Sequence, residues 1–199
     1  PAAHEDFELG VVNVAHPLET VSGDGWAFVE GDWGAALMVA DGLGHGPLAA
    51  AAAREANRVF LDEPSAAPTE IMGDLHRALH PTRGATVAIA RLDRARREIR
   101  FCGVGNIAGA VVSGPESRSM VSMNGTVGHE MYGMQEFVYP WPRRGFVILH
   151  SDGLQSRWRL DRYPAVEAHH PAIVAALLYR DFVRGRDDAT VAAVREPAA

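Results

Sequence analysis

The sequence predicts an α/β (α+β) fold in which two antiparallel sheets pack face to face and helices cover both outer faces, a four-layer α-β-β-α sandwich. Short apolar or alternating segments recur along the chain and are mostly joined by tight turns, which is typical of antiparallel strands. Helical composition interrupts them in two blocks, at residues 47–79 and 171–183. No repeat, low-complexity tract or long linker divides the 199 residues, so we expect a single domain over residues 1–199.

The expected strands coincide with the apolar or alternating segments, and Gly, Asp and Pro mark the turns between the strands. A turn is expected at residues 22–25, a hairpin turn at 30–34, and a loop rich in Gly and Met over 124–134. The predicted strands cover residues 7–16, 26–30, 35–40, 85–92, 98–103, 107–113, 120–123, 135–141, 145–150 and 189–195.

Three segments predict helices. Residues 47–61 are rich in Ala, Arg and Glu, which favour helix. A second helix is expected over residues 69–79, with Thr69 as a candidate N-cap and an apolar stripe facing the core. The third, over residues 171–183, is amphipathic and is expected to cover a sheet.

Composition excludes several classes of function. The formal charge of −6 argues against a nucleic-acid or anionic-membrane surface, so neither is an expected partner. All 19 basic residues are Arg, which we attribute to genomic bias. The single cysteine, Cys102, rules out an internal disulfide and is expected to be a core thiol and not a nucleophile. No signal peptide or bilayer-spanning apolar run is found, and we expect a soluble cytoplasmic protein.

One stretch organises the functional interpretation. The apolar strand predicted over residues 35–40 ends at Asp41, and a turn with glycines at positions 42, 44 and 46 follows. Glycine permits a close backbone approach, so the carbonyl of Gly42 and the carboxylate of Asp41 could face one ligand. Hard oxygen donors of this kind suit Mg²⁺ or Mn²⁺. For an isolated Asp-Gly pair, an ordinary turn with a capping Asp would be the better interpretation.

Further carboxylates occur in similar settings. Asp24 lies in Ser-Gly-Asp-Gly, Asp152 follows an apolar strand and precedes Gly, and Asp187 and Asp188 precede the last strand. Carboxylates that converge on one sheet edge repel one another, and a pair of divalent cations removes that cost. Two such ions can share and activate a water for in-line attack on phosphorus. No Gly-x-Ser-x-Gly elbow, no Cys–His pair and no phosphate-binding Lys loop offers an alternative chemistry.

These motifs resemble those of the PPM metal-dependent protein Ser/Thr phosphatases. The matching segments occur in the family's order: Ser-Gly-Asp at 22–24, Ala-Asp-Gly-Leu-Gly-His-Gly at 40–46, His-Ser-Asp-Gly-Leu at 150–154 and Arg-Asp-Asp-Ala-Thr at 186–190. Arg-Gly-Ala-Thr at 83–86 and Val-Gly-Asn-Ile at 104–107 resemble the short, single-domain bacterial branch typified by RsbX. The SpoIIE and RsbU phosphatases are more distant relatives with extra domains.

The resemblance implies a PPM-type phosphatase domain with two Mn²⁺ or Mg²⁺ ions. Asp41 would bridge both ions, the Gly42 carbonyl would complete the first site, and Asp24 would support it directly or through water. Asp152 and Asp187 would hold the second ion. Asp41 and Asp152 would thus act in catalysis through a metal-activated water, and Asp188, at a position that is Asn in many relatives, would orient the ligands.

The implied substrate is a phosphoserine or phosphothreonine on a regulatory protein. For RsbX-like members, the resemblance implies phosphorylated STAS-domain subunits of the stressosome. Three hypotheses therefore compete: an active phosphatase, a catalytically weak binding module with the phosphatase fold, and another two-metal hydrolase such as a nuclease. The complete carboxylate set disfavours the second, and the acidic charge disfavours the third.

Some positions depart from the family pattern. Eukaryotic relatives carry a His, thought to be a general acid, where this chain has Leu43, and the nearest alternative is His45. A solvated turn histidine is the simpler interpretation of His45. Many relatives have an Asp where this chain has Val104, which removes support for a third metal. Arg83 could contact a substrate phosphate, but we favour a structural role for it.

Overall fold

The computed structural model describes residues 7–197, so residues 1–6 and 198–199 of the expected domain lie outside the described residues. Its strands are β1 (Glu8–Val14), β2 (Asp24–Gly31), β3 (Gly34–Gly42), β4 (Ala85–Asp93), β5 (Glu98–Val104), β6 (Ala108–Ser113), β7 (Glu116–Met120), β8 (Phe137–Pro140), β9 (Phe146–His150) and β10 (Ala189–Arg195). Its α-helices are α1 (Pro47–Asp62), α2 (Pro68–Leu79) and α3 (Pro171–Phe182).

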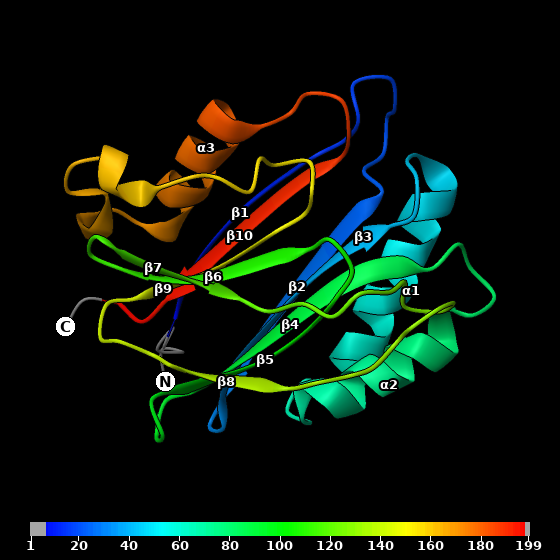
Figure 1. The fold of residues 1–199 in the computed structure, drawn as a ribbon, viewed down its shortest axis with the longest axis horizontal. Coiled ribbons are helices and arrows are strands. Elements are labelled where there is room, and N and C mark those ends of the chain that lie inside the picture. The colour runs from blue at the N-terminus through cyan, green and yellow to red at the C-terminus, as the bar shows by residue number, and fades with distance from the viewer. Residues whose placement is uncertain (1–6, 198–199) are drawn as a thin grey trace, which may run out of the picture.

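The strands form two five-stranded sheets with the orders β1-β10-β9-β6-β7 and β2-β3-β4-β5-β8. Every neighbouring pair is antiparallel. Helix α3 covers the outer face of the first sheet, and α1 and α2 cover the second (Figure 1). The four-layer sandwich predicted from the sequence is therefore confirmed.

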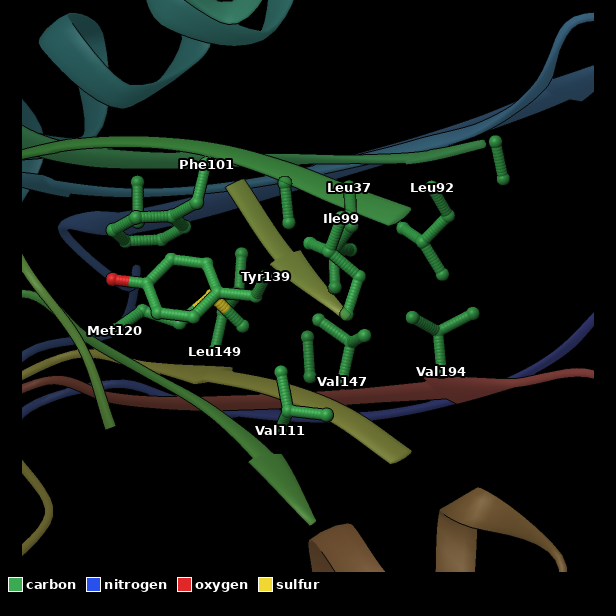
Figure 2. Packing of buried hydrophobic residues seen from close by; sticks show 14 of the residues in the cluster. Leu37, Leu92, Ile99, Phe101, Val111, Met120, Tyr139, Val147, Leu149 and Val194 are labelled. Carbon is green, nitrogen blue, oxygen red and sulfur yellow. The ribbon is translucent and has the colours of Figure 1, made fainter. Parts of the chain in front are cut away.

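The largest core cluster lies between the two sheets. Figure 2 shows Leu37 and Phe101 of one sheet facing Val147 and Leu149 of the other. All four side chains are fully buried. Because successive residues of a strand point to opposite faces, the alternate positions face the helices and form two further clusters there. This packing holds the two sheets, and hence their ends, in a defined relative position.

Helix α1 lies directly against the ends of β2 and β3. Its inward face is built from alanines, and a Cβ added at Gly42 would lie 2.2 Å from the carbonyl oxygen of Ala49. A Cβ added at Gly25 would lie 3.1 Å from Ala53 Cβ. Small residues on both elements permit this close approach, which brings the first turn of α1 beside Asp41.

Three details of the sequence-based prediction were wrong. The strand expected over 120–123 is instead β7, whose register pairs Ser113 with Glu116 and leaves only residues 114–115 in the turn. Most of β7 is exposed and polar, so it carries no apolar signal. Asp24 begins β2 and does not lie in a turn. Helix α2 begins at Pro68, so Thr69 is not its N-cap, and the Glu70 carboxylate accepts a hydrogen bond from the cap residue's N–H at 3.0 Å.

Within residues 7–197, no helix combines the length and the apolar character that a membrane crossing requires.

Candidate metal centre

The five predicted aspartates come from the ends of both sheets. Asp24 begins β2 and pairs directly with Asp41 near the end of β3. Asp152 follows β9, and Asp187 and Asp188 immediately precede β10. Figure 1 shows the start of β2, the end of β3 and the start of β10 at the same end of the sandwich. The fold thus brings together carboxylates that are far apart in the sequence.

Asp24 is buried, and it is held by residues of the opposite sheet. The Ser151 hydroxyl donates a hydrogen bond to Asp24 Oδ2 at 2.7 Å, and Ser151 Oγ accepts one from the Thr190 N–H at 2.9 Å. The Asn13 side-chain amide of β1 donates to the Asp24 carbonyl oxygen at 3.3 Å. The second carboxylate oxygen, Oδ1, is buried and has no hydrogen-bond partner among the described residues. Asp24 therefore presents one open oxygen in a fixed orientation.

The carboxylates raise one another's pKa values, in addition to the effect of burial. Burial raises the pKa of Asp41 to about 9, and the charges of Asp24, Asp152, Asp187 and Asp188 contribute to this shift. Burial also raises the pKa of Asp24 to about 7, while its hydrogen bond from Ser151 opposes the shift. A cluster of this kind favours protonation or a bound cation over a set of free charges.

Asp152 has a more mixed environment. Burial raises its pKa, the charge of Asp187 raises it further, and Arg184 and Arg186 lower it. The Asn106 amide donates to Asp152 Oδ2 at 2.5 Å. The carboxylate is therefore oriented by one hydrogen bond and flanked by positive charge from the loop that leads into β10.

Asp187 and Asp188 are held differently. The Asp188 N–H donates to Asp187 Oδ1 at 2.9 Å, and the His16 N–H donates to Asp188 Oδ1 at 2.8 Å. Asp188 is 3% exposed, and its Oδ2 has no partner among the described residues. This oxygen lies 2.7 Å from where a Cβ on Gly23 would be, so Asp188 packs against the segment that precedes Asp24.

Gly42 is part of the same close packing. Its N–H donates to the Gly23 carbonyl at 3.1 Å, and the N–H of Leu43 donates to the Gly84 carbonyl at 3.0 Å. The turn after Asp41 is therefore tied to the segments on both sides of it.

The donor set fits hard divalent cations. All of the side-chain donors are carboxylates, and the buried Oδ1 of Asp24 lacks a hydrogen-bond partner within residues 7–197. In that part of the chain, no three His, Cys, Asp or Glu side chains form a compact group of metal donors. The carboxylates therefore lie at one end of the sandwich without closing on one point.

Several contacts around the centre have no signal in the sequence. Ser151 precedes Asp152 in the motif, but only the structure shows that it contacts Asp24. His45 is exposed, as expected for a turn histidine, but its Nδ1 lies 2.6 Å from Glu19 Oε1. Its ring also stacks on His16 with a centroid separation of 4.5 Å. Such contacts join segments that no local pattern relates.

Two other candidates are placed clearly. Cys102 is fully buried, and burial raises the pKa of its thiol to about 11, which fits the expected core thiol. Arg83 is exposed, and it makes no hydrogen bond or ion pair with the described residues. One of its guanidinium nitrogens lies 3.0 Å from where a Cβ on Gly44 would be. These observations give no support to the structural role that we expected for Arg83.

Comparison with known proteins identifies similar sequences and folds. Residues 31–197 match the family described as stage II sporulation protein E (SpoIIE). Phosphoserine phosphatase RsbX of Bacillus subtilis (strain 168) is 24% identical over 153 residues, which cover 76% of either protein.

Solved structures with the same fold include a chain from a study of the bacterial stressosome as a modular system adapted to control secondary messenger signalling. It is 26% identical, with a TM-score of 0.88 over 96% of this chain and 100% of that one. RsbX in complex with magnesium has a TM-score of 0.79 at 21% identity, over 97% and 96% of the two chains. The PP2C phosphatase domain of SpoIIE from Bacillus subtilis has a TM-score of 0.80 at 18% identity, over 97% and 64%.

Proposed function

Because this chain belongs to the stage II sporulation protein E (SpoIIE) family, we propose that it is a metal-dependent phosphoserine/phosphothreonine protein phosphatase. The observation that carries the proposal is the gathering of five carboxylates from both sheets at one end of the sandwich. The similarity to phosphoserine phosphatase RsbX supports it. We also propose that residues 1–199 form a single PPM-type phosphatase domain.

We propose that the carboxylates hold two Mn²⁺ or Mg²⁺ ions. Asp41 would contact both. The Gly42 carbonyl would complete the first site, with Asp24 supporting it directly or through water, and Asp152 and Asp187 would contact the second ion. When bound, such ions supply an activated water and positive charge that stabilises a phosphoryl group under attack. Asp188, held by the His16 N–H, would orient the cluster and not contact an ion directly.

Neither Ser151 nor Cys102 is suited to act as a side-chain nucleophile. The Ser151 hydroxyl is buried, and its hydrogen bonds to Asp24 and from Thr190 fix its proton away from a substrate. Cys102 is buried, and its pKa is raised to about 11, so it is a poor thiolate. The carboxylates therefore act by binding and orienting, and the attacking group comes from solvent.

The proposed substrates follow from the relatives. RsbX is a phosphoserine phosphatase, and another similar chain comes from a stressosome study. We therefore propose phosphorylated STAS-domain regulatory proteins of the stressosome type as partners, and a cytoplasmic location for the reaction.

The test is hydrolysis of p-nitrophenyl phosphate and of phosphoserine, phosphothreonine and phosphotyrosine peptides. Protein treated with EDTA should be inactive, and Mn²⁺ or Mg²⁺ should restore turnover, with the phosphotyrosine peptide the poorest peptide substrate. Asp41→Asn should be inactive under all of these conditions. Its matched control is Asp32→Asn, which should be as active as the wild-type protein, because Asp32 is exposed and lies in the hairpin at the opposite end of β2 and β3. Turnover that survives EDTA, or equal release from phosphotyrosine, would contradict the proposal. Phosphopeptide binding without turnover would favour the binding module.

A further inference from the structure

Three exposed leucines lie on the segments that frame the carboxylate cluster. Leu18 is 87% exposed, Leu43 is 50% exposed and Leu48 is 58% exposed. We call these three residues the leucine rim. None of them belongs to a core cluster, so the leucines do not stabilise the fold by burial.

The segments of the leucine rim are tied to one another by polar contacts. The Leu18 N–H donates to His16 Nδ1 at 3.1 Å, and the His16 ring stacks on His45, two residues beyond Leu43. Glu19 lies 2.6 Å from His45 Nδ1, and its carboxylate is 2.7 Å from where a Cβ on Gly46 would be. The loop that carries Leu18 is therefore held against the turn that carries Leu43 and the start of α1.

The same segments reach the carboxylates. Leu43 is two residues after Asp41, and Leu48 is next to Ala49, whose carbonyl packs on Gly42. The backbone of His16, two residues before Leu18, donates to Asp188. The leucine rim thus borders the centre at which a phosphate would react under the proposed function.

The position of the leucine rim indicates its occupant. Exposed apolar side chains on connected segments beside a functional centre offer a contact surface for a partner. An anionic membrane is disfavoured because the rim lies beside five carboxylates on a chain of charge −6. A permanently bound second copy would cover the centre itself. A protein segment whose phosphate enters the centre comes beside the segments that carry these leucines.

We propose that the leucine rim docks the protein segment that carries the phosphoserine, by contact with apolar side chains that flank the phosphorylated residue. This inference rests on the proposed function and extends it from a reaction to a sequence preference. A small phosphate ester has no such flanks, so it would reach the centre without using the leucine rim.

The test compares two phosphoserine peptides of equal charge, one with leucines and one with serines beside the phosphoserine, and p-nitrophenyl phosphate as a third substrate. The wild-type protein should show a KM for the leucine-flanked peptide about tenfold below that for the serine-flanked peptide. The double variant Leu18→Ser/Leu48→Ser should lose this difference and keep kcat/KM for p-nitrophenyl phosphate within about twofold. Leu43 is left unchanged because it adjoins Gly42.

Leu61→Ser is the matched control, since Leu61 is 53% exposed and lies near the end of α1 opposite to Leu48. It should leave all three substrates unaffected. Equal KM values for the two peptides in the wild-type protein would overturn the proposal that the leucine rim docks the substrate segment. A preference that survives in the double variant would overturn it as well.

Fluorescence anisotropy with the labelled, unphosphorylated leucine-flanked peptide separates this inference from the proposed function. Suppose that the wild-type protein hydrolyses none of the substrates with Mn²⁺ but binds this peptide, and that the double variant does not bind it. The proposed activity would then be wrong, whereas the docking role of the leucine rim would be supported. Equal binding by the two proteins would overturn the proposed docking role of the leucine rim, whether or not the protein is active.

Discussion

Asp24 and Asp41 lie directly opposite each other on the neighbouring antiparallel strands β2 and β3. Residues paired in this way have Cα atoms about 4.5 to 5.5 Å apart, and like charges there destabilise a sheet. Ser151 and Asn13, both from the other sheet, hold Asp24 in this position. Contacts between the sheets therefore hold together two carboxyl groups that would repel each other if both were ionised, which is understandable if a cation offsets the repulsion.

Asp41→Asn should stabilise the metal-free protein. Burial and the neighbouring carboxylates raise the pKa of Asp41 from 3.8 to about 9, so the folded state binds a proton that the unfolded state releases between these values. The stability from that proton is fully present below pH 3.8 and is lost as pH rises toward 9. The gain in melting temperature from the substitution should therefore grow between about pH 5 and about pH 8. Differential scanning calorimetry in EDTA measures it.

The comparison with the wild-type protein isolates this effect from other groups, such as His150, whose pKa is lowered by burial. Asp32→Asn is the matched control, because Asp32 is exposed and lies in the hairpin between β2 and β3, at the end away from Asp41. A difference between wild type and Asp41→Asn that stays constant with pH would contradict the shifted pKa of Asp41.

Asp152→Asn and Asp187→Asn should each lower the Mn²⁺-dependent turnover of p-nitrophenyl phosphate at least about a hundredfold, because each removes a proposed ligand charge. Asp41→Asn should do the same, and circular dichroism should show an intact fold in all three variants. Asn106→Ala removes only the hydrogen bond to Asp152, so its loss should be smaller, about tenfold. Undiminished turnover in any of the aspartate variants would refute its assignment.

Ser151→Ala should weaken Mn²⁺ binding as well as stability. The substitution leaves Asp24 Oδ2 without its donor and the Thr190 N–H without its acceptor, in a fully buried position. Loss of such a bond costs about 1 to 3 kcal/mol. Isothermal titration calorimetry should show weaker Mn²⁺ binding, since the Asp24 carboxylate then lacks the hydrogen bond that orients it. Ser122→Ala breaks a hydrogen bond to the Ile107 carbonyl and should leave Mn²⁺ binding unchanged; an equal effect in both variants would argue against a specific role for Ser151.

Gly10→Ala should prevent stable folding. A Cβ at Gly10 would lie 2.0 Å from the backbone nitrogen of Ala172, so β1 and α3 would have to separate. Clashes with backbone are not relieved by side-chain rotation, and we expect a loss of about 3 kcal/mol or more. Gly133→Ala is the control, because no heavy atom lies within 4 Å of its added Cβ. Urea unfolding of both variants measures the difference, and equal stabilities would show that the β1–α3 contact can adjust.

Local patterns in the chain were sufficient for much of the fold. A composition rich in helix-favouring residues placed α1, and the amphipathic spacing of apolar residues placed α3, each to within a residue. The step from an apolar strand into Asp-Gly singled out Asp41 and Asp152 in the same way. Where the local pattern was weak, as in the exposed strand β7, the prediction placed the strand incorrectly.

The relative positions of the aspartates depended on contacts that no local pattern contains. The pairing of Asp24 with Asp41 comes from strand register. The approach of Asp152 and Asp187 to that pair comes from the packing of one sheet on the other. The hydrogen bond from Ser151 to Asp24 joins residues 127 positions apart. Residue types along the chain therefore specified which chemistry was available, whereas the packed sheets decided which side chains meet, because distances across a sandwich are set by the core between its layers.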